Sequence, residues 1–329
     1  MSIFHHKRRR LFAIVETTPG TPIAAASVFV AANGKVPVYD LRVVPVVQNM
    51  DRNPDGLTFD AVDSVRWGES YNVTFTTDAY CGTGAGVAPS YGLLFKSCGL
   101  AETISAGVSV TYTVDSDACP TVTLGVELIN DAGTASRRII IGGALGSFVI
   151  STDSVGKPGK IAWTFTGKAI ATPDVDSTPV ATVVYDDAVA RLPQLRSTTT
   201  TDGGVTVQVN ALSFDRGLMT EWETDLTDAT GYLKRIVASS APKLTWDPAK
   251  MTAASQATLQ QLFQGTTGAV VVTFGSAAAT RLKINLARAQ KDSLSDDARG
   301  VTSTWGTTFH ANRSSVTGNG DDAFTIVFD

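Results

Sequence analysis

The sequence is poor in charge, cysteine and histidine, and each shortage narrows the range of functions. Only 18% of the 329 residues are charged, below the usual quarter, whereas 43% are hydrophobic. The three cysteines, Cys81, Cys98 and Cys119, form no Cys-x-x-Cys pair, so neither a structural zinc site nor a redox motif is indicated. An odd number of widely spaced cysteines favours reduced thiols in a cytoplasmic setting over a disulfide.

Long apolar runs are also missing. No run reaches the ~18 residues that a membrane helix needs, so we expect no membrane partner. The start, "MSIFHHKRRRLFAIVE", has a basic stretch but no small-residue cleavage site, so we expect no signal peptide. The net charge of −4 argues against nucleic-acid binding by the body of the protein, because duplex affinity comes largely from neutralised phosphates. Low charge instead points to a protein partner.

Residues suited to catalysis are scarce. His310 is the only histidine outside the first six residues, and we expect it to be a surface or hydrogen-bonded side chain rather than a base. No Gly-x-Ser-x-Gly motif is present, and the glycines of "CGTGAGVA" fit no phosphate-binding loop. Three aspartate pairs lie in loop-like segments without EF-hand spacing: Asp186 and Asp187, Asp296 and Asp297, Asp321 and Asp322. We therefore expect no enzyme activity, no cofactor and no metal.

Period-two alternation is the main signal that the sequence does carry. In "GSFVISTDSVGKPGKIAWTFTGKAI", residues 146–170, two alternating runs flank a Gly-Lys-Pro-Gly turn and predict a β-hairpin. The second strand has an apolar face of Ile161, Trp163 and Phe165 and an opposite face of Ala162, Thr164 and Thr166. An ordinary solvent-facing strand would carry more Lys and Glu, so this weakly polar face needs a functional explanation.

Two short helices and their neighbours suggest an internal duplication. Residues 89–98 and 253–265 each predict a helix that ends at a glycine, and the second has Leu259, Leu262 and Phe263 on one side. In both halves, strands precede the helix and a long hairpin closes the half, which matches Trp163 with Trp305. This shared order favours two related mainly-β units.

The predicted organisation has four parts. Residues 1–40 form an N-terminal extended arm, residues 41–170 a first β-unit, residues 171–194 a proline-rich linker and residues 195–329 a second β-unit. Pro19 and Pro22 keep the arm extended. Its basic stretch, which includes Arg8, Arg9 and Arg10, is either a solvated tail or an arm that docks on acidic surface of a neighbouring copy.

The segments "ETTPGTP", "GTGAGVAPSYGLLFKSCGLAET" and "LGSFVISTDSVGKPGKIAWTFTGKA" resemble the major tail tube proteins of long-tailed bacteriophages. The resemblance covers roughly residues 16–169 by motif and the second half only by the order of its elements. It implies β-sandwich or barrel-like units, each flanked by a short helix. In the family such units join edge to edge into rings with a continuous inner β-barrel, and the rings stack into a hollow tube that delivers the genome.

The resemblance also implies partners and site residues. Ser151, Ala162, Thr164 and Thr166 would face the channel, and the arm would contact the next ring. Two units in one chain imply trimeric, pseudo-hexameric rings, with hexameric rings as the alternative. The other implied partners are the tape measure protein, the tail terminator and initiator proteins, and double-stranded DNA in transit. The expected location is the virion tail, assembled in the host bacterial cytoplasm. A capsid-decorating or adhesin-type β-protein stays open as a second interpretation, and an enzyme on a β-scaffold is the least favoured.

Overall fold

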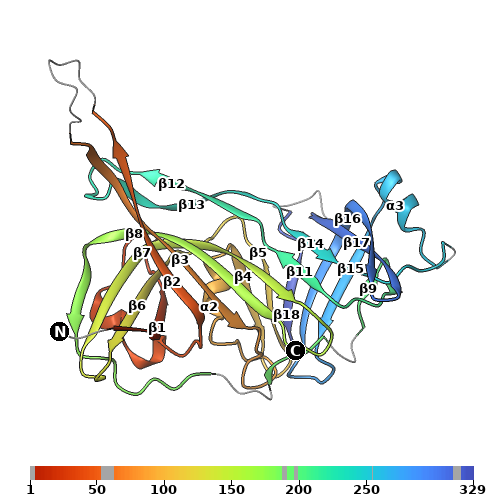
Figure 1. Cartoon of the computed structure of the whole chain (residues 1–329), viewed down its shortest axis with the longest axis horizontal. Helices are drawn as coiled ribbons and strands as arrows, with labels where there is room; N and C mark the ends of the chain where they lie inside the picture. The colour runs from red at the N-terminus through yellow and green to blue at the C-terminus, as the bar shows by residue number, and fades with distance from the viewer. Residues whose placement is uncertain (1–3, 53–62, 187–190, 196–198, 254, 314–319) are drawn as a thin grey trace.

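The chain is mainly β. The computed structural model describes residues 4–52, 63–186, 191–195, 199–253, 255–313 and 320–329, and Figure 1 shows an elongated molecule built around long antiparallel strands. Strands account for 54% of the residues and helices for 7%, so the predicted mainly-β class is confirmed.

The elements alternate between long strands and short helical turns. The strands of the first half are β1 (Phe4–Val15), β2 (Tyr39–Met50), β3 (Val65–Asp78), β4 (Leu100–Ser105), β5 (Ser109–Val114), β6 (Val122–Asn130), β7 (Ser136–Thr152) and β8 (Lys160–Ser177). Its helical turns are α1 (Ala25–Val28), a 3-10 turn (Ala31–Asn33) and α2 (Gly92–Lys96).

The second half has shorter strands before its final hairpin. They are β9 (Thr201–Asp202), β10 (Val205–Thr206), β11 (Leu212–Asp215), β12 (Leu218–Thr224), β13 (Tyr232–Ser240) and β14 (Lys243–Trp246). After α3 (Thr258–Gln264) come β15 (Thr267–Phe274), β16 (Leu282–Arg299), β17 (Thr302–Asn312) and β18 (Thr325–Phe328). Because β8 continues to Ser177, the first residues of the predicted linker belong to a strand.

One sheet runs through both halves of the chain. Eight of its strands follow one another in the order β16-β17-β14-β11-β7-β8-β3-β2, and each neighbouring pair is antiparallel. Strand β11 joins the halves, because it pairs with β7 on one side and with β14 on the other. The sheet is open within the chain, and β12 and β13 form a separate two-stranded sheet.

The core lies on one face of this sheet and confirms the predicted hairpin. Ile161, Trp163 and Phe165 are all at most 1% exposed, as the alternation of β8 requires. Trp163 packs against Phe95 of α2 at 5.1 Å between ring centres. Its indole nitrogen donates to the hydroxyl of Thr77 at 2.9 Å, so the buried polar atom is satisfied.

The N-terminal segment is not the unpaired arm that the sequence analysis predicted. Residues from Arg9 to Val15 pair in continuous antiparallel register with Val122–Leu128 of β6. Leu11, Phe12 and Ala13 are buried in succession, which means that both faces of β1 are covered there. A strand that is covered on both faces lacks the alternation of polar and apolar residues from which strands are predicted. The basic residues at the start of β1 favoured the interpretation as a tail instead.

The turn after β1 is fixed by a buried carboxylate. Glu16 accepts hydrogen bonds from the hydroxyls of Thr121 (2.5 Å) and Thr123 (2.7 Å). It also accepts from the backbone N–H groups of Gly20 (2.9 Å) and Gly143 (2.7 Å). Four donors compensate the desolvation of the charge and hold this turn against β6 and β7.

Three expectations for the second half need correction. The predicted helix starts later, at Thr258, although Gly265 ends it in the left-handed conformation at φ 62°. Its apolar side faces outward, because Leu259 is 47% and Phe263 82% exposed. The polar stretch 291–300, predicted as a loop, lies largely in β16 and pairs with β17.

The match between Trp163 and Trp305 is also wrong in its packing. Trp163 is fully buried, whereas Trp305 is half-buried and lies under the ammonium of Lys250, 4.2 Å from its ring centre. The buried aromatic of β17 is instead Phe309, which lies opposite Leu244 and packs on Trp246. The match of the two tryptophans was wrong because the core position of the second hairpin is Phe309, four residues after Trp305.

Candidate functional site: an uncovered face of the sheet

The face of the sheet opposite the core carries the residues that sequence analysis singled out. Ala162 and Thr164 are exposed, and Ser151 and Thr166 are partly exposed. Thr164 lies between Ser147 of β7 and Thr74 of β3. The structure therefore brings the four predicted residues together on one face of neighbouring strands.

The same chemistry continues into the second half of the chain. A row of hydroxyl side chains crosses five adjacent strands in direct register: Ser151, Ser213, Thr245, Thr308 and Ser293. The hydroxyls of Thr245 and Thr308 are 3.3 Å apart, within hydrogen-bonding distance. Sequence analysis did not select these second-half positions, although the alternation in "LSFD" and "KLTW" carries the signal.

The charges on this face include two opposed pairs and an exposed cation, Arg42 of β2, which lies opposite Thr74. Lys160 of β8 lies opposite Asp78 of β3, and Asp215 of β11 lies opposite Lys243 of β14. Lys160 also lies opposite Ser151, so this pair continues the hydroxyl row onto β8 and β3. Opposite signs offset one another within each pair, whereas Arg42 adds a positive charge at the β2 edge of the face.

One end of the face is covered by the β12–β13 hairpin. The ammonium of Lys168 on β8 donates to Asp228, near the tip of that hairpin, at 2.7 Å. Burial raises the pKa of Asp228, but hydrogen bonds from Lys168 and Thr230 outweigh that effect and lower it below the usual value. The hairpin also stacks Trp222 on Tyr232 at 4.2 Å. The open part of the face thus lies between this contact and the opposite strand ends.

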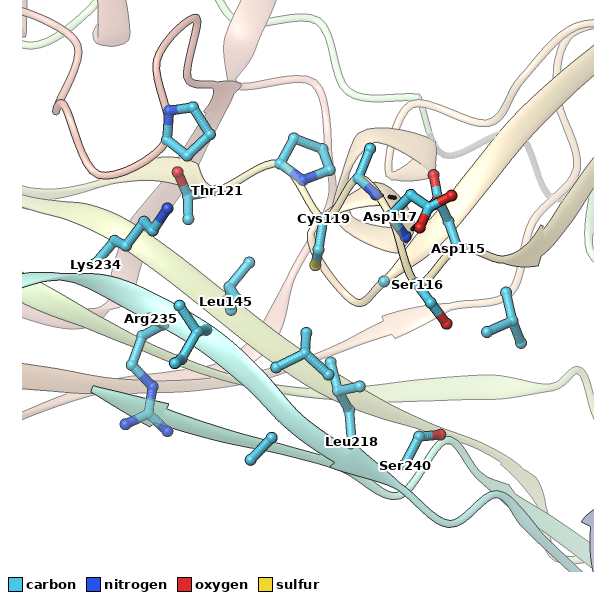
Figure 2. A pocket seen from close by; sticks show the side chains of 18 of the residues that line it. Asp115, Ser116, Asp117, Cys119, Thr121, Leu145, Leu218, Lys234, Arg235 and Ser240 are labelled. Atoms are coloured by element: carbon cyan, nitrogen blue, oxygen red, sulfur yellow. Dashed lines mark hydrogen bonds between the residues drawn. The ribbon is translucent and has the colours of Figure 1, made fainter. Parts of the chain in front are cut away.

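A groove of about 790 Å³ separates the β12–β13 hairpin from the loop that follows β5. Figure 2 shows Lys234, Arg235 and Leu218 on the hairpin side, with Asp115, Ser116 and Cys119 on the loop side. The Asp115 carboxylate accepts the backbone N–H groups of Asp117 and Ala118, so it organises the loop. Burial raises the pKa of Cys119 to about 11, and a protonated thiol is a poor nucleophile.

The basic residues of the predicted arm are used inside the chain. A guanidinium nitrogen of Arg8 donates to the backbone carbonyls of Asn130 and Asp131, and one of Arg9 donates to that of Leu41. Arg10 donates to the carbonyl of Val180 at 2.9 Å and lies 3.6 Å from the buried carboxylate of Glu127. These contacts lie within the chain, and the predicted contact with a neighbouring copy stays a prediction.

The two prolines of the predicted arm lie against the same chain. Pro22 packs against Gly142 of β7, where a Cβ would lie 2.2 Å from the proline ring. Pro19 is exposed beside the groove. Neither proline is in a strand, in agreement with the expectation that this stretch lacks regular pairing.

The described residues offer little for metal or acid–base chemistry. Within them, His, Cys, Asp and Glu side chains form no group of three or more that could hold a metal ion. His310 lies 3.3 Å from the carboxylate of Asp292, and both side chains are partly exposed. No helix in the described part of the chain is both long and apolar enough to cross a membrane.

Comparison with known proteins adds no assignment. No protein-family model matches the sequence, and no curated protein matches it significantly. The uncovered Ser/Thr face, the open sheet and the exposed helix α3 are therefore the features from which function is argued.

Proposed function

We propose that the chain is a structural subunit of a phage-type tail tube, whose copies join through their sheets around a channel for DNA. The observation that carries this proposal is the uncovered face of Ser, Thr and Ala side chains across one continuous antiparallel sheet. A sheet with one packed face and one bare, weakly polar face is suited to lining a passage. In this role the chain has no enzyme activity.

The order of strands supports two tandem units. In the first half the neighbours are β6-β7-β8-β3-β2, and in the second half they are β15-β16-β17-β14-β11. A short helix follows β3 in one half and β14 in the other. The two sets share order, antiparallel pairing and helix position, which is the pattern that a duplication produces.

The unpaired sheet edges support assembly into rings. Within the described residues, β2 pairs only with β3, and residues 291–299 of β16 pair only with β17. Free edges of this length recruit other strands. Because the two edges are at opposite ends of the same sheet, joining one to the other on the next copy is a heterologous contact that closes a ring or continues as a helix.

Strand number favours three copies in a ring. Each copy contributes eight strands of the continuous order, and three times eight is 24. With ~4.8 Å between strands and a tilt of about 40°, a 24-stranded barrel is roughly 50 Å across its backbone and a 16-stranded one roughly 30 Å. Side chains that point inward reduce the open width of both barrels. The 24-stranded barrel of three copies still leaves a channel for a hydrated DNA duplex, whereas the 16-stranded barrel of two copies does not.

The chemistry of the proposed channel suits a moving polyanion. A fixed cation would hold a phosphate, whereas hydroxyl and methyl groups offer only weak contacts. The charges of Lys160 and Asp78, and of Lys243 and Asp215, offset one another, so the exposed Arg42 at the β2 edge is the cation of this face that would contact a phosphate. The tape measure protein, and the terminator and initiator proteins at the tube ends, are the other partners that this role requires.

Electron microscopy of the purified protein tests the proposal. We expect tubes or stacked rings, and single rings before stacking. A stable monomer, or a lone closed ring that never stacks, at high concentration and in the presence of tail initiator complexes would contradict it and favour the capsid-decorating or adhesin-type alternative.

A matched pair of variants tests the channel wall. Thr164→Lys and Thr245→Lys each add a cation to the uncovered face, and Val108→Lys adds one to an exposed side chain in the turn between β4 and β5, on the core side of the sheet. We expect particles with either threonine variant to assemble tails and to release DNA more slowly, with an effect that weakens as salt rises. Equal slowing by Val108→Lys would contradict a channel location for the threonines.

A further inference from the structure

Helix α3 presents an apolar surface that its own chain leaves uncovered. Phe263 is 82% and Leu259 47% exposed, so most of the predicted core side of this helix is in contact with solvent. Exposed large apolar side chains that lie together mark interaction sites more often than isolated ones do.

The helix is nevertheless held firmly in place. The buried ammonium of Lys291 on β16 donates to Asp202 at 2.8 Å and also to the side chain of Gln261 in α3. Gln290 donates to the carbonyl of Gly265, at the helix end, at 3.3 Å. These bonds fix α3 beside β16, so the exposed apolar surface is presented at a defined position.

That position is next to a free edge and on the core side of the sheet. Lys291 lies opposite the buried Phe309 and over its ring, so its side chain is on the core face. From Lys291 onward, β16 pairs with β17 alone within the described residues. If a strand of another copy paired with this part of β16, its core-facing side chains would therefore contact helix α3.

The other end of the sheet carries a matching apolar row. Val43, Pro45 and Val47 of β2 share the core face, because Val43 lies opposite the buried Val73 and the next two alternate with it. Val43 is half-buried, and Pro45 and Val47 are exposed. In Figure 1, β2 and α3 are at opposite ends of the elongated molecule, so one copy cannot bring the two surfaces together.

The chain contains an internal example of the arrangement that would join two copies. At the junction between its halves, Phe95 of α2 packs on Phe148 of β7 at 4.9 Å, and Phe148 packs on Phe214 of β11 at 6.3 Å. Phe95 of α2 thus packs beneath β7 at the place where β11, the neighbouring strand from the second half, pairs with β7. In the strand order, β16 takes the place of β7, α3 that of α2, and β2 that of β11.

We propose that Leu259 and Phe263 of α3 pack on Val43, Pro45 and Val47 of the next copy, beneath a junction in which β2 of that copy adds to the free edge of β16. The partner is a second copy of this chain, because the chain carries both surfaces on the same face and at opposite ends of one sheet. This inference rests on the proposed assembly and names the apolar contact that holds it together.

Cysteine cross-linking between two differently labelled chains tests the contact. Phe263→Cys and Val47→Cys are placed in separate chains, both with Cys119→Ser, because Cys81 and Cys98 are buried. After assembly and mild oxidation, we expect disulfide-linked dimers in the mixture and several-fold fewer with either variant alone. Val108→Cys, on an exposed residue in the turn between β4 and β5, is the matched control partner for Phe263→Cys, because those strands pair with each other and with β18 and not with β2.

Each outcome decides between the two proposals. Tubes that form normally from Phe263→Ser chains, or a mixture that cross-links no better than the Val108→Cys control, would overturn the α3 contact and leave the tube proposal standing. Phe263→Cys chains that cross-link to one another would replace it with a symmetric pair of helices. Wild-type protein that never assembles would overturn both. Loss of tubes in Phe263→Ser with an unchanged unfolding midpoint supports the contact.

Discussion

Helices α2 and α3 are built on a similar Leu-Phe sequence and have opposite surroundings. In α2, Leu94 and Phe95 are completely buried. In α3, Phe263, which follows Leu262 in the same way, is 82% exposed. Local sequence therefore specifies a short helix with an apolar side in both places, while the rest of the chain determines whether that side is covered.

The cover over α2 comes from distant segments of the chain. Tyr112 of β5 packs on Phe95 at 4.9 Å, and Phe328 of β18, near the end of the chain, lies 6.3 Å away. Strand β18 pairs with both β5 and β16, so the last strand of the chain completes the first half. Within the described residues α3 receives no comparable strand, which is consistent with cover supplied by another copy.

The largest expected effect is a difference between the two phenylalanines. Phe95→Ala should lower the free energy of unfolding of the monomer by about 3–5 kcal/mol, because it empties a packed aromatic cluster. Phe263→Ala should change it by less than about 0.5 kcal/mol. Urea unfolding of the unassembled chain measures both, and similar losses would show that α3 is covered within the monomer.

The next effect concerns the buried ion pair that holds α3 on β16. Lys291 and Asp202 are each 6% exposed, so Lys291→Met should cost about 3 kcal/mol, because it leaves a buried carboxylate without its cation and with the Gln256 amide as its remaining side-chain donor. The double variant Lys291→Met with Asp202→Leu should recover most of that loss. Denaturant unfolding of the single and double variants forms the test, and a double variant no more stable than the single one would contradict the pairing.

A smaller and pH-dependent effect is expected where the β12–β13 hairpin meets β8. The lowered pKa of Asp228 contributes stability that is fully present above the ordinary aspartate pKa near 4 and is lost as the pH falls through the lower folded value. Asp228→Asn should therefore cost about 1 kcal/mol or less at pH 7, because the carboxylate is partly exposed, and almost nothing below about pH 3. Thermal unfolding of both proteins across this range checks it. A difference that grows on acidification would have the wrong sign.

The last effect is a difference in the reactivity of cysteines that all belong to the first half of the chain. Cys81, Cys98 and Cys119 all lie in that half, and burial raises the pKa of Cys81 to about 12. At pH 8 we expect thiol reagents to react far more slowly with the folded chain than with the urea-unfolded chain. Phe95→Ala should accelerate the reaction and Phe263→Ala should not, which again separates the two helices.

Sequence alternation predicted the fold best where one face of a strand is buried and the other is open. The β7–β8 hairpin, with Trp163 inside and Thr164 outside, follows directly from period two. The left-handed cap at Gly265 was equally readable, because glycine adopts that conformation without a steric cost. These features depend only on residues close together in the chain.

The errors arose where distant segments decide the outcome. β1 is covered on both faces, so Leu11, Phe12 and Ala13 are buried in succession and no alternation revealed the strand. The acidic stretch of β16 has the polar composition of a loop, and it is a strand because it pairs with β17. The exposure of α3 could not be predicted either, since it depends on which half receives β18.

The pairing of β1 decides what a truncation of the first ten residues would do. If residues 1–10 were only an arm, removing them would leave the fold intact. In the structure, Arg9 and Arg10 are paired with Leu128 and Glu127 of β6, and the guanidinium of Arg10 lies beside the buried Glu127. The truncation should therefore weaken the first half itself, so it cannot isolate a contact between rings.

Cryo-electron microscopy of the assembled particle would show the ring, the channel and the boundary between copies in one reconstruction. We expect three chains in each ring and an inner sheet that is continuous from β2 to β16 and across to the next copy. Thr164 and Thr245 would face the channel, and Phe263 would be buried at the boundary between copies. Six chains in a ring, or a ring in which only one half of each chain lines the channel, would contradict the proposed trimer.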